Sequence, residues 1–127
     1  MRVLALDFGA ARTGVAVSDE TRTLARPVGI VERAATEAGL DEVAALVAEH
    51  GANLVLVGLP LTLRGKRGEQ ARITEAFVEI LRERLEVPVE VEDERFTTAL
   101  AQQSGGTASE DAVAAAHLLQ GWLERNG

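Results

Sequence analysis

Three acidic positions that lie far apart in the sequence have the residue types and surroundings of a metal site. Asp7 follows the apolar run 3–6, which reads as a buried strand. The acids 92–94 end the last strand-like stretch, and Asp111 lies in the first turn or so of the last predicted helix. If the first strand is central and the two later strands run parallel to it, Asp7 and the acids 92–94 meet at one carboxyl edge. Open sheets bind ligands at that edge.

Acidic side chains that are brought together repel one another, so a cation should hold them. Mg²⁺ and Mn²⁺ prefer oxygen ligands in octahedral geometry. Two such ions about 3.5–4 Å apart can stabilise both the attacking and the leaving oxygen of a phosphodiester. This chemistry needs no Ser, Cys or His nucleophile, and the chain has no cysteine and two histidines. The pattern therefore indicates metal-dependent chemistry at a phosphate ester.

Each acid also has an explanation that involves no ligand. Asp7 could simply close the turn after its strand, as Asp often does. Asp111 is favoured near a helix start by the helix dipole alone. At least one of the acids 92–94 is expected to be a solvated strand end. His50 and His117 read as a helix C-terminal cation and a helix-surface residue, not as metal ligands.

Basic residues are expected around the same edge of the sheet. Arginine matches phosphate oxygens in bidentate fashion, so a local basic patch could hold a phosphate backbone. Glycines in the predicted loop 59–68 would let the backbone approach a ligand. The alternative is that a charged loop keeps this edge soluble. The basic residues are Arg12, Arg64, Lys66, Arg67, Arg72 and Arg95.

The N-terminal third of the chain predicts three strands. The runs 3–6 and 13–18 form a hairpin around a glycine-bearing turn, and the third strand spans 24–31. Pro27 cannot donate to a strand ladder, so this third strand is placed at a sheet edge. The spacing of apolar residues predicts a helix over 36–50 that Gly51 ends.

The rest of the chain alternates strands and helices. Residues 53–58 read as a buried strand and 69–85 as a second helix, followed by an outer strand over 87–92. A capping box at 107–110 begins the last helix. The result is an α/β fold, one mixed sheet with helices on its faces. The inward-facing residues of the second helix are expected to be Ile73, Ala76, Phe77, Ile80 and Leu81. Those of the last helix are expected to be Ala112, Ala115, Ala116, Leu119 and Leu123.

Composition limits the class of protein. At 127 residues, the chain is read as one domain, 1–127. The absence of cysteine, of a signal peptide and of an apolar stretch of about 20 residues predicts a cytoplasmic protein without a membrane partner. The net charge of −7 argues against a general nucleic-acid coat protein. It does not exclude an enzyme that meets a phosphodiester through bound cations.

Four segments together resemble one known family. These segments are LALDFGAARTGVAVSD, VGLPLTLRGKRGEQA, VEDERFTTALA and DAVAAAHLL. In this order they resemble the bacterial family of Holliday junction resolvase-like proteins, also described as pre-16S rRNA nucleases. The resemblance spans nearly the whole chain. It implies an RNase H-like fold, a five-stranded mixed sheet of three antiparallel and then two parallel strands, with helices on both faces.

The resemblance also implies roles for particular residues. Asp7, Glu94 and Asp111 match the family's catalytic metal acids, with Asp93 as the alternative to Glu94, and the cofactor is Mg²⁺ or Mn²⁺ in a two-ion site. Arg12, Arg95 and the loop residues Arg64, Lys66 and Arg67 match the substrate side less specifically. The link 99–111 is shorter than the family's loop, which often bears basic residues, so part of that substrate contact does not transfer.

The leading hypothesis is a nuclease that acts on structured RNA, in maturation of the 5′ end of precursor 16S rRNA. The first alternative is a resolvase of Holliday junctions or other branched DNA. The second is a non-catalytic nucleic-acid-binding module in ribosome assembly. A nucleotide-phosphate binder similar to actin-like ATPases ranks last, because those proteins need a duplicated domain. Trp122 and Leu123 could cap the core or meet a second subunit, so a homodimer stays open.

Overall fold

One five-stranded sheet forms the centre of the molecule. The computed structural model describes residues 1–9, 11–59, 68–93 and 108–126. The sheet order is β3-β2-β1-β4-β5. The first three strands pair antiparallel, whereas β4 runs parallel to β1 and β5 parallel to β4, as predicted. The strands are β1 (Arg2–Asp7), β2 (Arg12–Ser18), β3 (Ala25–Glu32), β4 (Ala52–Leu59) and β5 (Val89–Asp93).

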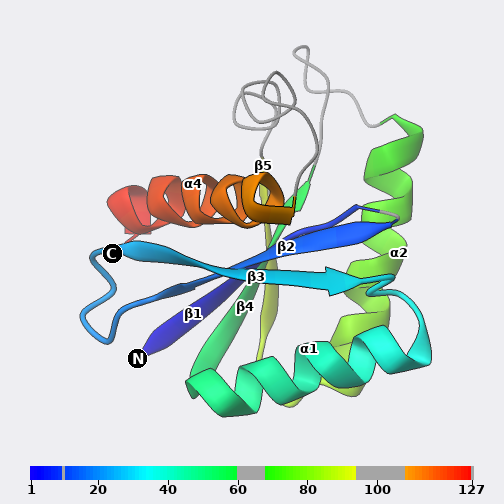
Figure 1. Cartoon of the computed structure of the whole chain (residues 1–127), viewed down its shortest axis with the longest axis horizontal. Coiled ribbons are helices and arrows are strands. Elements are labelled where there is room, and N and C mark those ends of the chain that lie inside the picture. The colour runs from blue at the N-terminus through cyan, green and yellow to red at the C-terminus, as the bar shows by residue number, and fades with distance from the viewer. Residues whose placement is uncertain (10, 60–67, 94–107, 127) are drawn as a thin grey trace.

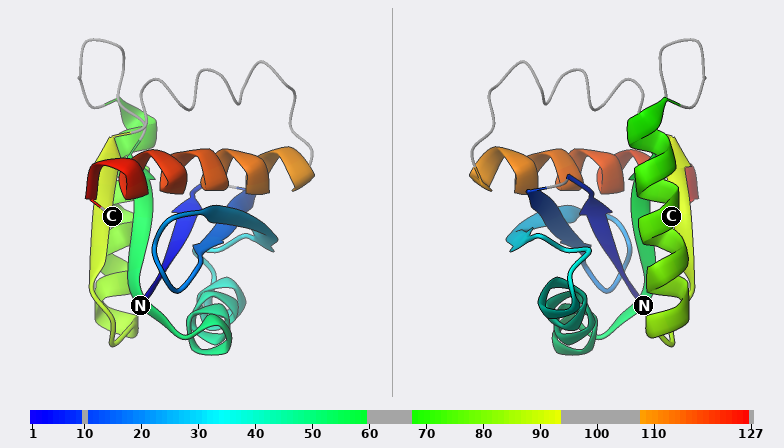
Figure 2. Two further views of the ribbon diagram at one scale, coloured as in Figure 1. Left: turned by 90° about the vertical axis from the view of Figure 1, so that its left-hand side faces the viewer. Right: turned by 90° about the vertical axis from the view of Figure 1, so that its right-hand side faces the viewer.

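Helices cover both faces of this sheet. Helices α1 (Glu37–His50) and α2 (Glu69–Arg84) lie on one face, and α4 (Ala108–Asn126) crosses the other (Figures 1 and 2). Along β1, Leu4 and Leu6 belong to the core under α1 and α2, while Val3 and Ala5 belong to the core under α4. Burial on both faces explains why β1 is apolar throughout, since each fully buried aliphatic side chain contributes about 1.5–3 kcal/mol.

The helix ends follow local chemistry. Thr36 precedes α1, and its hydroxyl accepts a hydrogen bond from the Gly39 N–H at 3.2 Å. Gly51 ends α1 with φ 62° and ψ 38°, the left-handed conformation that glycine adopts at low cost. The predicted capping box at 107–110 begins outside the described residues. None of the described helices is both long and apolar enough to cross a membrane.

The predicted buried face of α2 is confirmed at Phe77 and Leu81 and is wrong at Ile73, Ala76 and Ile80. Ile73 and Ile80 are 45% and 41% exposed, whereas Thr74 is fully buried. Burial of Thr74 costs little because its hydroxyl donates to the Gln70 carbonyl at 2.8 Å. Phe77, which was predicted to point inward, stacks on Phe8 with ring centroids 4.3 Å apart. The predicted stripe of α4 is confirmed at Ala112, Ala115, Leu119 and Leu123.

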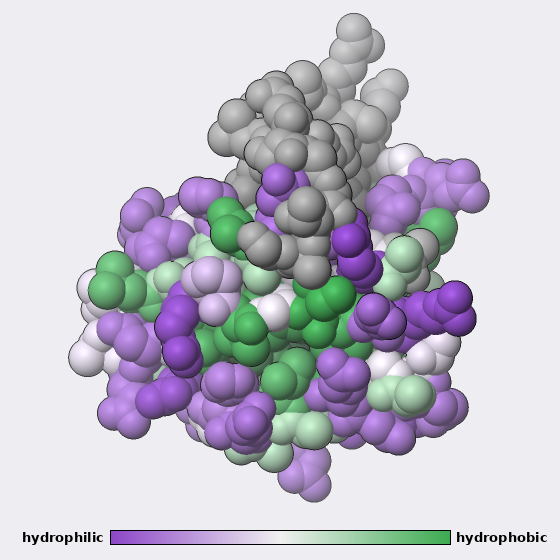
Figure 3. All heavy atoms as spheres, viewed as in Figure 1, coloured by the Kyte–Doolittle hydropathy of each residue, from purple (hydrophilic) through white to green (hydrophobic). Residues whose placement is uncertain are grey.

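Strand β3 lies at an edge of the sheet, as Pro27 predicted. Apolar side chains gather over β3 between α4 and α1 (Figure 3). Val28 of β3 and the preceding Leu24 are exposed. The register against β2 shifts between Val15 and Ala16, next to Pro27. A proline and a bulge both disfavour the pairing of an edge with another strand. The apolar edge is therefore protected against edge-to-edge aggregation.

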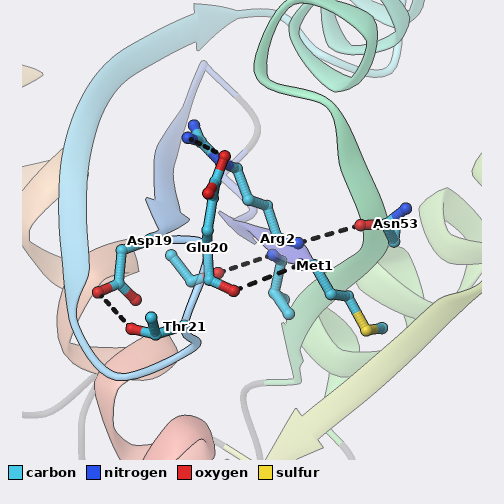
Figure 4. A network of polar contacts seen from close by, with 8 residues as sticks. Met1, Arg2, Asp19, Glu20, Thr21 and Asn53 are labelled. Carbon is cyan, nitrogen blue, oxygen red and sulfur yellow. Dashed lines mark hydrogen bonds and ion pairs between the residues drawn. The ribbon is translucent and has the colours of Figure 1, made fainter.

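Polar contacts tie down the N-terminal end of β1. The Arg2 N–H donates to Asn53 Oδ1 at 3.0 Å, and the Met1 ammonium group donates to the Glu20 carbonyl at 3.3 Å (Figure 4). The Arg2 guanidinium pairs with the Glu20 carboxylate at 3.5 Å. In the adjoining turn, Asp19 accepts hydrogen bonds from Thr21 and from backbone N–H groups. These contacts fix the register of β1 at the end opposite Asp7.

Candidate metal and nucleic-acid site

Asp7 ends the central strand at the edge where the site was predicted. It is half-buried and lies opposite Gly14 in the β1–β2 ladder. Because side chains alternate along a strand, Asp7 shares the face of Val3 and Ala5, which is the face that α4 covers. The end of β1 thus places Asp7 on the face of the sheet that α4 covers.

Gly14 brings the start of α4 against the sheet beside Asp7. A Cβ atom added to Gly14 would lie 1.9 Å from the carbonyl oxygen of Asp111 and 3.1 Å from the Ala112 nitrogen. Only glycine permits such an approach of two backbones. Since Gly14 pairs with Asp7, this contact brings Asp111 next to the end of β1. Two of the predicted acids, from opposite ends of the chain, therefore meet at one corner of the sheet.

Arg12 forms an ion pair with Asp111. The Arg12 Nε atom lies 3.0 Å from Asp111 Oδ2, and the two side chains are 36% and 28% exposed. The Nε–H does not point at the oxygen, so Oδ2 is a buried carboxylate atom without a hydrogen-bond donor in the described structure. A buried carboxylate oxygen without a hydrogen-bond donor is costly unless a cation lies beside it. Arg12 is that cation in this structure, so Asp111 Oδ2 occupies an environment that suits a positively charged partner.

The acids at the end of β5 lie on both faces of the sheet. In the β4–β5 ladder Glu92 pairs with Gly58 and Asp93 with Leu59. Glu92 forms an ion pair with Arg125 of α4, which places its side chain on the α4 face. Alternation therefore turns Asp93 toward the face that α1 and α2 cover, away from Asp7. Glu94 lies outside the described residues, and the choice between Asp93 and Glu94 stays a prediction.

The predicted substrate contacts are only partly described. Arg12 lies at the site, and Arg72 is exposed in the first turn of α2. Arg64, Lys66, Arg67 and Arg95 lie outside the described residues. The ends of β4 and β5 and the starts of α2 and α4 flank these segments on the same side of the molecule (Figure 1). The described parts of the chain hold no group of three or more His, Cys, Asp or Glu side chains that could bind a metal ion.

Asp7 and Asp111 nevertheless fit a hard divalent cation. Asp7 and Asp111 supply carboxylate oxygens, the donors that Mg²⁺ and Mn²⁺ prefer. Asp111 Oδ2 is buried without a donor, and Gly14 leaves no side chain between the start of α4 and β2. By contrast, the pocket at the other end of β1 has a paired cation, because Arg2 contacts Glu20 there. His50 in the same pocket lies 3.7 Å from Glu49.

Comparison with known proteins identifies the family of this chain. The family model described as "RuvX: Holliday junction resolvase" matches residues 1–125. The chain belongs to the RuvX family. A relative from Anaeromyxobacter sp. (strain Fw109-5), named "Putative pre-16S rRNA nuclease", is 42% identical, with 98% of this chain and 97% of that protein covered. A relative of the same name from Chloroflexus aurantiacus is 39% identical over 96% of this chain and 86% of its own length.

Solved structures show the same fold in resolvases. RuvC of T. thermophilus, in complex with a Holliday junction, superposes with a TM-score of 0.62 at 16% identity, over 99% of this chain and 96% of that one. The Fowlpox virus resolvase in complex with Holliday junction DNA gives 0.60 at 14% identity, over 99% of both chains. At such low identity the likeness establishes the fold, and it confirms the RNase H-like architecture expected for the RuvX family.

Two features of the site were not predicted from the sequence. The pairing of Arg12 with Asp111 leaves no local signal, because the two residues come from opposite ends of the chain. The role of Gly14 does have a signal, since a glycine inside a strand pattern indicates a bulge or a close backbone approach. The partner of that approach, the first turn of α4, becomes evident only in the folded RuvX chain.

Proposed function

We propose that this RuvX protein is a metal-dependent nuclease that hydrolyses phosphodiester bonds of structured RNA, in 5′-end maturation of precursor 16S rRNA. The observation that supports this most directly is the meeting of Asp7 and Asp111 around Gly14 at the carboxyl edge of the sheet. Relatives at 39–42% identity, named "Putative pre-16S rRNA nuclease", supply the substrate class.

The proposed metal ligands are Asp7, Asp111 and Glu94. Asp93 turns toward the opposite face of the sheet, so Glu94 is kept as the proposed third ligand. When bound, Mg²⁺ or Mn²⁺ would neutralise the acids and stabilise charge that develops on the phosphate oxygens. The protein's own contribution is to hold the carboxylates on rigid elements, a strand end and a helix start. The residues proposed to grip the substrate are Arg12, Arg64, Lys66, Arg67 and Arg95.

Resolution of branched DNA is the second candidate function. The family model's description names a Holliday junction resolvase, and two solved structures with this fold contain a Holliday junction. The same acids would serve either substrate, because both reactions break a phosphodiester bond. A choice between RNA and DNA depends on how the nucleic acid is gripped, and four of the five proposed grip residues lie outside the described residues.

A cleavage assay tests the proposal. Purified protein is incubated with the 5′ precursor region of 16S rRNA, with single strands and with four-way DNA junctions, over a range of Mg²⁺ and Mn²⁺ concentrations. We expect metal-dependent cleavage, strongest on the precursor RNA. Cleavage of the junction alone would favour the resolvase. Binding without cleavage at every metal concentration would refute the nuclease and leave the non-catalytic module.

Asp7→Asn identifies the site. This change removes the charge but keeps the shape, so turnover should fall by at least about 100-fold while thermal stability is retained. Asp41→Asn is the matched control, because Asp41 is an exposed acid of α1 that pairs with Arg84, and it should retain full activity. A folded Asp7→Asn protein with undiminished metal-dependent cleavage would rule out this assignment.

A further inference from the structure

We propose that Arg12 is a resident counter-ion of Asp111, that a divalent cation displaces it, and that the released guanidinium is then available for a substrate phosphate. This inference rests on the proposed function of the same site. It assigns Arg12 a task before substrate arrives, namely competition with the metal for a carboxylate. Loading of the metal and exposure of the phosphate-binding group would thereby become one coupled event.

The geometry of the pair supports competition. Arg12 Nε lies 3.0 Å from Asp111 Oδ2, the oxygen that is buried and has no hydrogen-bond donor in the described structure. The contact is therefore one of charge without a directed hydrogen bond, which is weaker than a bidentate arginine–carboxylate pair. Such a contact can be given up when a better cation arrives.

Arg12 lies close to the position that the divalent cation would occupy. Arg12 begins β2, two residues before Gly14, and alternation places both on the face of α4. Asp7, the other described acid, is the ladder partner of Gly14. A divalent ion shared by Asp7 and Asp111 would thus bind within a few ångströms of the guanidinium. Two positive centres at that distance repel each other, so Arg12 must move away from Asp111 Oδ2.

A purely structural ion pair predicts the opposite effect on metal binding. If Arg12 only oriented Asp111, its removal would loosen the carboxylate and weaken the metal site. If Arg12 competes with the metal, its removal strengthens the site. The sign of the change in metal affinity therefore separates the two roles, and this measurement needs no cleavage.

Mn²⁺ binding to the full chain provides the test, with free Mn²⁺ quantified by electron paramagnetic resonance at low ionic strength. We expect Arg12→Gln to bind Mn²⁺ about threefold to tenfold more tightly than the unaltered protein. Arg26→Gln, which removes an equal charge from an exposed position of β3, is the matched control and should change the affinity by less than about twofold. The gain should vanish when Asp111→Asn is added to Arg12→Gln.

A second measurement uses the unaltered protein and does not depend on the stability of any variant. In ¹H–¹⁵N spectra of arginine side chains, the Arg12 Nε–H signal should shift on titration with Mg²⁺, together with the backbone signal of Asp111. Equal or weaker Mn²⁺ binding by a folded Arg12→Gln protein, or an Arg12 signal that does not respond to Mg²⁺, would overturn the proposal. If the protein still cleaved its substrate in that case, the exchange would be refuted but the nuclease assignment would be retained. Tighter Mn²⁺ binding without any cleavage would support the exchange and refute the nuclease.

Discussion

Gly14→Ala is the sharpest test of how the site is assembled. The new Cβ would lie 1.9 Å from the Asp111 oxygen, whereas ordinary contacts begin at 3.4 Å. The start of α4 must therefore retreat from β2 by about 1.5 Å, because the atoms it meets are backbone and not the end of a flexible side chain. Asp111 would move with the helix, away from Asp7.

The expected magnitudes follow from this displacement. Overpacking lowers the free energy of unfolding by about 1–3 kcal/mol. Replacement of a strand glycine by alanine raises it by about 0.5–1 kcal/mol, so the net effect should be a loss of stability. A melting temperature lower by about 3–10 °C is expected for a domain of this size. Misplacement of a catalytic group by about 1 Å can lower the rate by about 100-fold. Activity should therefore fall far more than stability.

The assay compares kcat/KM, Mn²⁺ affinity and melting temperature for Gly14→Ala and Gly121→Ala. Gly121 lies within α4, and an added Cβ there would be 3.5 Å from the tip of Arg125, which is an ordinary contact. This control should stabilise the protein by about 0.5–1 kcal/mol, since alanine is the better helix former, and should leave cleavage unchanged. A Gly14→Ala protein with unaltered melting temperature, Mn²⁺ affinity and cleavage would refute the close approach.

Two further predictions concern stability. In urea unfolding, Leu81→Ala should lower the free energy of unfolding by about 2–5 kcal/mol, because Leu81 is buried. Ile80→Ala should lower it by less than about 0.5 kcal/mol, because Ile80 is exposed. Equal losses for the two variants would contradict the observed buried face of α2. Hydrogen bonds from the backbone of Thr23 and Leu24 lower the pKa of Asp19 below its usual 3.8. The stability from this carboxylate is present above pH 3.8 and is lost as the pH falls through the lowered pKa. Asp19→Asn should therefore destabilise the protein at pH 7, and its difference from the unaltered protein should shrink as the pH falls below 3.8.

Much of the fold could be predicted from the sequence, because its signals are local. The apolar run of β1 indicates burial on both faces, and Leu4 and Val3 do lie in the two separate cores. Pro27 lacks an N–H and marks an edge strand, and Gly51 permits the left-handed residue that ends α1. Each of these follows from the conformational limits of a residue and its near neighbours. The four motif segments likewise indicate the family from the sequence alone.

Tertiary structure decided what depends on distant partners. The buried face of α2 was predicted from side-chain hydrophobicity alone, yet Thr74 is buried because the helix itself satisfies its hydroxyl. The contact between Gly14 and the start of α4, and the pairing of Arg12 with Asp111, join the two ends of the chain. Periodicity shows which face of an element is apolar, but only the order of the strands and the path of the helix across them determine which charges meet. Asp7 and Asp111 lie at one corner of the sheet for that reason.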